Sequence, residues 1–154
     1  MAKKPKKIKF PSELRLDLVS KDWVIIATGR GKRPAAFKKE KRATMEIPRE
    51  ICPFCNIETQ EKPILIYSRG KKIKGEKIPK NWTTIVIPNK YPALLPYPKI
   101  EKKIEGEFYQ RMPAVGFCEL VVTKDHEMHF PHFEISQVKE VLSAYQDRYL
   151  DLMK

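Results

Sequence analysis

The chain has 154 residues, the size of one ordinary domain, and can bury a hydrophobic core without disulfide bonds. A composition of 42% hydrophobic and 32% charged residues argues against a disordered chain, and no apolar run approaches the roughly 20 residues that a membrane span needs. The formal net charge of +12 predicts attraction to polyanions or to phosphorylated ligands, without choosing between them.

The N-terminal segment 1–12 is rich in lysine and lacks the apolar stretch of a secretory signal. We therefore expect a basic tail over 1–12, a domain over 13–154 and a cytoplasmic location. Three cysteines are an odd number, which together with the missing export signal argues against a disulfide framework and favours reduced thiols or a metal.

The first predicted strand covers 23–28, a β-branched, apolar stretch that stops at a Gly-Arg-Gly turn. Arg30 lies within this turn and Arg33 follows it, and their guanidinium groups match the geometry of phosphate oxygens. A plain basic surface turn is the alternative interpretation.

The Cys-Pro-Phe-Cys sequence at 52–55 has the spacing of half a tetrahedral zinc site. No second cysteine pair follows it, so Cys52 and Cys55 either stay as two reduced thiols or share a metal with histidines from elsewhere. Cys118, between apolar neighbours, is interpreted as a small core residue.

Two further strands are predicted at 82–87 and 117–123. Asn89 follows the first of them directly, where it could bond a base or a ribose or simply form a turn. The tryptophans that begin the strands at 23 and 82 are expected to pack in the core. The connections 69–80 and 91–111 contain no glycine-rich phosphate loop.

All three histidines, His126, His129 and His132, lie just after the third strand. Pro131 argues against a continuous helix there, so we expect a loop from which one imidazole reaches the cysteine pair.

An amphipathic helix is predicted from Ser136, as its N-cap, to Lys154. Its apolar positions recur in steps of three and four, and they are Ile135, Val138, Leu142, Tyr145, Tyr149 and Leu152. Because no stop signal precedes the last residue, the pattern suggests a truncated domain. The expected fold class is α+β, with a mostly antiparallel sheet and a C-terminal helix.

Four motifs in this order resemble the N-terminal half of the galactose-1-phosphate uridylyltransferase family, in the histidine-triad superfamily. They are the segment 16–24 leading to 30–34, the cysteine pair at 52–55, the Ile-Pro-Asn-Lys-Tyr-Pro-Ala-Leu segment at 87–94, and the segment 116–126 ending in Asp-His. The resemblance covers nearly all of 13–154 and implies an incomplete fold of the histidine-triad type.

The resemblance implies that Cys52, Cys55 and His126 bind Zn²⁺, with a fourth ligand downstream. It assigns Arg30, Arg33 and Asn89 to the nucleotide sugar and allows a homodimer in which the arginines act across the interface. Lys90 stands where the family usually has an aspartate, so a carboxylate contact is lost and uridine specificity is in question. Asn-Ile-Glu at 56–58 replaces the usual Pro-Gly-Asn turn, which leaves the local nucleotide contacts open.

The implied activity is nucleotidyl transfer from UDP-glucose to galactose 1-phosphate through a uridylyl-histidine, a step of galactose metabolism. The chain lacks the family's His-Pro-His-x-Gln motif, so we expect it to be inactive alone. Two alternatives remain. One is an adenylyl-transferring relative resembling ADP-sugar phosphorylase, and the other is a small basic zinc module that binds nucleic acid, which the missing second metal pair opposes.

Overall fold

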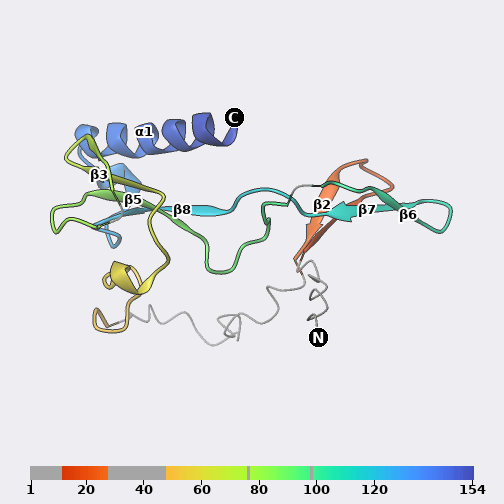
Figure 1. Ribbon diagram of the computed structural model, residues 1–154, viewed down its shortest axis with the longest axis horizontal. Helices are drawn as coiled ribbons and strands as arrows, with labels where there is room; N and C mark the ends of the chain where they lie inside the picture. The colour runs from red at the N-terminus through yellow and green to blue at the C-terminus, as the bar shows by residue number, and fades with distance from the viewer. Residues whose placement is uncertain (1–11, 28–47, 76, 98) are drawn as a thin grey trace, which may run out of the picture. The chain divides into compact units, whose positions relative to one another are not determined.

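A computed structural model describes residues 12–27, 48–75, 77–97 and 99–154 (Figure 1). The elements in chain order are β1 (Glu13–Leu16), β2 (Trp23–Ile26), the 3₁₀ turn η2 (Ile57–Thr59), β3 (Leu65–Ser68), β4 (Lys71–Ile73), β5 (Thr84–Pro88), β6 (Lys103–Glu105), β7 (Tyr109–Pro113), β8 (Glu119–Thr123), the 3₁₀ turn η3 (Phe130–His132) and α1 (Ile135–Leu152).

The chain divides into two compact units. Met1–Lys38 and Tyr91–Cys118 form the first, which holds an antiparallel sheet of order β2-β1-β7-β6, called sheet A. Lys39–Lys90 and Glu119–Lys154 form the second, which holds an antiparallel sheet of order β4-β3-β5-β8, called sheet B, together with α1.

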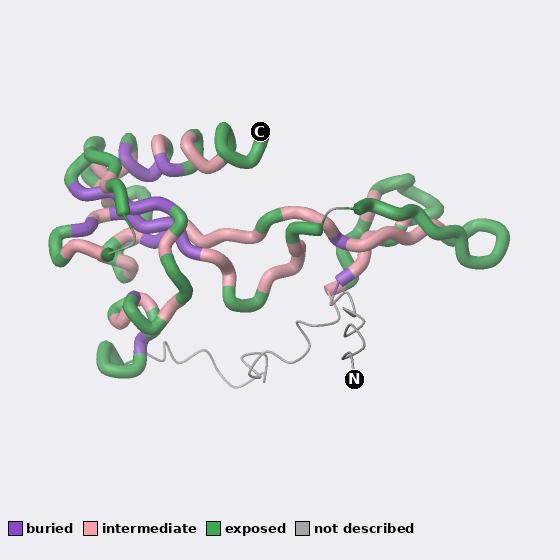
Figure 2. The backbone as a smooth tube through the Cα atoms, in the orientation of Figure 1, coloured by how far each residue is buried: buried purple, intermediate pink, exposed green. Residues whose placement is uncertain are grey.

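Sheet B is covered on both faces, so its central strands β3 and β5 are buried along their length (Figure 2). One face packs Ile66, Ile85 and Ile87 against Ile57 and Trp82, from the segments around the cysteine pair and before β5. The other packs Leu65, Tyr67 and Val86 against Ala144 of α1. Because successive side chains point to opposite faces, a strand covered on both sides needs a continuous apolar run.

A two-residue turn joins β3 to β4 through Arg69 and Gly70, both at positive φ, 49° and 76°. Positive φ at both central positions is the geometry of the tight hairpin turn that matches strand twist. The Gly70 amide donates to the buried Glu140 carboxylate of α1, so the turn is also tied to the helix.

Sheet A has a different environment. Within the described part of the chain no helix packs on it, and the three aliphatic residues of β2 are exposed. Glu13, Arg15, Arg111 and Glu105 form a row of ion pairs across β1, β7 and β6.

The predicted α+β class with antiparallel sheets and a C-terminal helix is confirmed, and all three predicted strands exist. Their bounds differ: β5 begins at Thr84, β8 begins at Glu119, and β2 ends at Ile26. Five strands were not predicted. Two of them, β4 and β6, are three-residue, lysine-bearing edge strands whose composition resembles that of a loop.

The helix begins two residues earlier and ends earlier than predicted. Its N-cap is Glu134, not Ser136, and the Glu134 side chain makes no cap hydrogen bond. The apolar stripe of this amphipathic helix does not pack on the sheet, because Ile135, Leu142, Tyr145 and Tyr149 are all more than half exposed. No helix in the described residues is long and apolar enough to span a membrane.

Candidate metal centre

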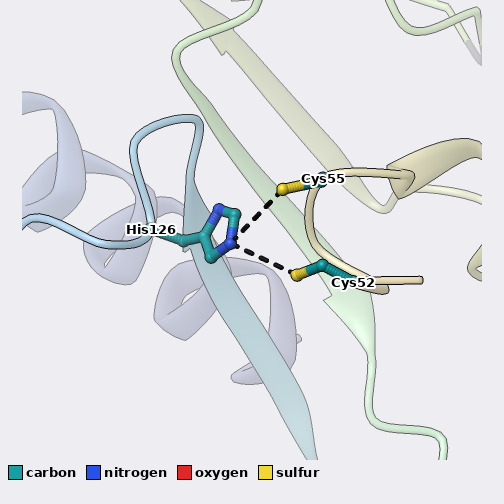
Figure 3. Close-up of side chains that lie close together, drawn as sticks. All are labelled: Cys52, Cys55 and His126. Atoms are coloured by element: carbon teal, nitrogen blue, oxygen red, sulfur yellow. Dashed lines mark hydrogen bonds between the residues drawn. The ribbon is translucent and has the colours of Figure 1, made fainter. Parts of the chain in front are cut away.

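Three potential ligands meet in the second unit: Cys52, Cys55 and His126 (Figure 3). His126 Nε2 lies 3.3 Å from Cys52 Sγ and 3.7 Å from Cys55 Sγ, and the three ligand atoms lie within 4.8 Å of one another. Zn–S bonds of about 2.3 Å and Zn–N bonds of about 2.0 Å at tetrahedral angles separate ligand atoms by roughly 3.5–3.8 Å. The donor set and its spacing therefore fit a zinc ion, and they leave one tetrahedral position for a further ligand.

The cysteine turn is shaped by Asn56, which sequence reasoning did not assign to the site. Its Nδ2 donates to the carbonyl oxygens of Arg49 (2.9 Å), Glu50 (3.1 Å) and Cys52 (3.0 Å). The next residue, Ile57, is 2% exposed and anchors the turn in the core under sheet B. The sequence signal was an asparagine directly after the second cysteine, because asparagine side chains readily bond nearby backbone.

His126 is presented by a turn at the end of β8. Asp125 Oδ1 accepts the Met128 amide at 3.2 Å, and the Asp125 carbonyl accepts the Thr123 hydroxyl at 2.9 Å. The Phe54 ring packs against the imidazole, with ring centroids 5.7 Å apart. Nδ1 of His126 is buried and has no hydrogen-bond partner among the described residues, so only Nε2 faces the cysteines.

The two thiols differ electrostatically. The backbone amides of Cys55 and Phe54 donate toward Cys52 Sγ, and the Cys55 hydrogen bond is the main reason why the pKa of Cys52 is lowered. Burial, followed by the neighbouring Cys52 thiol, raises the pKa of Cys55. Cys52 is therefore the thiol that ionises first, to the thiolate form that a metal needs.

A cavity of about 440 Å³ opens beside these ligands. Its wall includes Arg49, Trp82 and Lys124 as well as Cys55 and His126. Arg49 pairs with Glu127 across the cavity at 3.5 Å, and both side chains are largely exposed. The cavity thus presents two basic side chains, Arg49 and Lys124, and two acidic ones, Asp125 and Glu127, next to the candidate metal position.

The remaining predicted site residues are not gathered there. Asn89 is half-buried and Lys90 is exposed, directly after β5. Thr84, at the start of β5, pairs with Thr123, whereas Pro88 pairs with Glu119, so Asn89 and His126 follow opposite ends of the β5–β8 pair. Arg30 and Arg33 lie outside the described residues.

The other candidate ligands also stand apart from the cluster. His129 and His132 are exposed, and neither is within reach of the two thiols. Cys118 is half-buried and belongs to the first unit. Of the three histidines, the fold selects His126.

Comparisons with known proteins show which sequences this chain resembles. The chain is 26% identical to the galactose-1-phosphate uridylyltransferase of Thermotoga maritima over 142 residues, which is 91% of this chain and 36% of the relative. It is 28% identical to the ADP-glucose phosphorylase of Arabidopsis thaliana over 144 residues, which is 88% of this chain and 38% of the relative. No solved structure matches.

The chain thus spans little more than a third of the length of these relatives. The family profile described as galactose-1-phosphate uridyl transferase, N-terminal domain, matches residues 2–154, essentially the whole sequence. The chain belongs to the galactose-1-phosphate uridyl transferase family and corresponds to its N-terminal domain.

Proposed function

We propose that this chain is the zinc- and nucleotide-sugar-binding portion of a hexose-1-phosphate uridylyltransferase. The observation that carries the proposal is the Cys52, Cys55 and His126 cluster, found in a chain that matches the family's N-terminal domain along its length. Bound zinc would cross-link the cysteine turn to the loop after β8 and so hold both walls of the adjoining cavity in place.

In this proposal each remaining site residue has one task. Arg30 and Arg33 bind the phosphates of UDP-glucose, for which their planar, permanently charged groups are suited. Asn89 bonds the nucleoside, and Lys90 adds a positive charge beside it. Hexose 1-phosphate is the second substrate.

The reaction needs a nucleophile that the 154 residues do not supply. A histidine attacks the α-phosphorus of UDP-glucose and releases glucose 1-phosphate, and the uridylyl group then passes from that histidine to galactose 1-phosphate. The three histidines of this chain stand three residues apart and form no His-x-His element. The chain alone is therefore expected to bind nucleotide sugar without turning it over.

A second candidate is an adenylyltransferase that accepts an ADP-sugar. The similarity to a protein named ADP-glucose phosphorylase favours it. So does Lys90, which replaces the carboxylate expected beside a uridine-specific asparagine. The two candidates share the zinc site and differ in the nucleotide base.

Titration with Co²⁺, a spectroscopic substitute for Zn²⁺, tests the metal site. We expect one equivalent to bind with thiolate-to-cobalt absorption, and Cys52→Ser or His126→Ala to weaken binding at least about tenfold. Cys118→Ser and His129→Ala are matched controls outside the cluster and should bind like the unaltered chain. Asn56→Asp, which points an acceptor at three carbonyls, should weaken binding although it removes no ligand. Equal binding by all variants would refute the site.

Calorimetric titration tests the nucleotide site. A higher affinity for UDP-glucose than for ADP-glucose supports the uridylyltransferase proposal. A higher affinity for ADP-glucose supports the adenylyltransferase. Asn89→Ala should weaken whichever ligand binds. If the chain bound neither nucleotide sugar but bound generic RNA or DNA in a salt-sensitive way, both transferase proposals would be rejected in favour of a nucleic-acid-binding zinc module.

A further inference from the structure

A cavity of about 400 Å³ lies between the first half of α1 and the turn that joins β3 to β4. The turn contributes Arg69 to its wall, and the helix contributes Lys139, Glu140 and Ser143. All of its lining residues belong to the second unit, so the cavity is complete within that unit. Its volume is within the range of about 300–1,000 Å³ that is usual for small-molecule sites.

This cavity is separate from the two sites proposed above. Neither the candidate metal ligands nor Asn89 line it. Thr83, which does line it, directly precedes β5, whereas Asn89 directly follows β5. A strand rises about 3.3 Å per residue, so the two residues lie roughly 20 Å apart.

Two cations stand at the solvent-exposed rim of the cavity, one on each wall. Arg69 and Lys139 are both exposed, and neither forms an ion pair within the described part of the chain. A guanidinium group and an ammonium group that converge in this way are suited to bind a phosphate group. The rim therefore favours an anionic group of a ligand.

The backbone conformation at Arg69 is unusual for an arginine. Its φ of 49° lies in the left-handed region, and asparagine, aspartate and glycine are the residues usually found at this position of a two-residue hairpin turn. The Arg69 amide donates to Thr83 Oγ1 at 3.0 Å, which holds the turn in this conformation. An arginine at a position where the backbone disfavours it points to a role for its side chain.

The inner wall of the cavity offers groups that bind hydroxyls. Oε1 of the buried Glu140 accepts from the hydroxyls of Thr83 and Thr84, and Oε2 accepts from the Gly70 amide. Since each carboxylate oxygen has about two acceptor positions, Oε2 can accept one more donor. The half-buried Ser143 makes no hydrogen bond with its side chain to another described residue, so its hydroxyl is also available.

We propose that this cavity binds a phosphorylated sugar at a site distinct from that of the nucleotide sugar. The phosphate lies between Arg69 and Lys139, and the sugar hydroxyls bond Glu140 Oε2 and Ser143. The two ends of the ligand cannot exchange places, because the Glu140 carboxylate would repel a phosphate at the inner wall whereas it accepts from a hydroxyl. The inference does not depend on the nucleotide proposal.

Titration of the full 154-residue chain with glucose 6-phosphate, followed by calorimetry and NMR, tests the site. Its phosphate is on a different carbon from that of the proposed second substrate. We expect one molecule to bind and to shift the amide signals of Gly70, Ser136 and Ser143, with little change at Asn89. Glucose and inorganic phosphate should each bind at least about tenfold more weakly, because each makes only one of the two sets of contacts.

The variant Arg69→Asn separates binding from folding. Asparagine fits the turn, so this variant should unfold at the same temperature as the unaltered chain or higher, yet bind glucose 6-phosphate at least about tenfold more weakly. Lys139→Ala should weaken binding to a similar extent. Lys71→Ala is the matched control, since Lys71 is an exposed cation beside the same turn but does not line the cavity.

All three variants should keep the Co²⁺ binding and the nucleotide-sugar affinity of the unaltered chain, which distinguishes failure of this site from failure of the proposed function. Equal affinity for inorganic phosphate and glucose 6-phosphate would overturn the proposal, because the cavity would then be a plain anion site. Signal shifts centred on Asn89 and Lys90 would overturn it as well. So would unchanged binding by Arg69→Asn, or no binding of glucose 6-phosphate by the unaltered chain.

Discussion

Strands β2 and β5 can be compared directly, because both are rich in isoleucine and valine and both lie next to a tryptophan. Trp23 is the first residue of β2, and Trp82 lies two residues before β5. Trp82, before β5, is 7% exposed, and Ile85, Val86 and Ile87 are essentially buried. In β2, by contrast, Val24, Ile25 and Ile26 are 46%, 44% and 37% exposed. A similar sequence pattern therefore yields a core strand in one unit and an exposed strand in the other.

The difference lies in what covers each sheet. Sheet B has α1 on one face and the segment around Ile57 on the other, so both sets of alternate side chains are removed from water. Sheet A has neither cover among the described residues, and ion pairs around Glu13 and Arg111 cross its strands. Strand propensity is local, whereas burial depends on a second layer.

The largest expected effect comes from paired truncations in the two strands. Ile85→Ala should lower the free energy of unfolding by about 2–5 kcal/mol, because Ile85 is fully buried and leaves a cavity. Ile25→Ala, at a 44% exposed position, should cost less than about 1 kcal/mol. Urea denaturation of both variants measures the difference. Equal losses would mean that sheet A is as well covered as sheet B.

The polar contacts between α1 and sheet B should give the next largest effect. Glu140→Ala leaves the Thr83, Thr84 and Gly70 donors without their acceptor, which should cost about 1–3 kcal/mol. Glu134→Ala is the control, since the exposed Glu134 side chain makes no cap hydrogen bond, and it should stay within about 0.5 kcal/mol. Thermal unfolding compares them. If the two variants were equally stable, the polar side of α1 would not be what holds the helix on the sheet.

The smallest effect is a pH dependence at Tyr67. Burial, with a further contribution from the hydrogen bond to Asp147, raises the pKa of Tyr67 to about 12. The folded state keeps this proton when the unfolded state has lost it, so the associated stability is present below pH about 10 and is lost as the pH rises toward 12.

Absorbance titration at tyrosinate wavelengths, taken as the difference between the unaltered chain and Tyr67→Phe, should show this late ionisation. Asp147→Asn should move it to lower pH by removing the neighbouring negative charge. A difference titration centred near pH 10 in the unaltered chain would contradict the buried Tyr67–Asp147 contact.

The candidate metal site was partly predictable. Cys52 and Cys55 are neighbours in a turn, so their spacing alone indicated a pair of ligands. The histidine partner is more than seventy residues away, and the family resemblance rather than spacing pointed to His126, which the fold places beside both thiols. The hydrogen bonds from Asn56 to the Arg49 and Glu50 carbonyls depend on the backbone conformation before Cys52. The position of the asparagine in the sequence does not specify that conformation.

The sequence by itself determined the strands with strong β-branched runs, the existence of the C-terminal helix and its apolar stripe, because these follow from local periodicity. Only the tertiary structure decided where that stripe points. Tyr67, Thr84 and Glu119 engage Asp147, Glu140 and Arg148, and these contacts, together with the buried Val141 and Ala144, set which side of α1 lies on the sheet. The apolar stripe is thereby left on the surface, with Ile135, Leu142, Tyr145 and Tyr149 all more than half exposed.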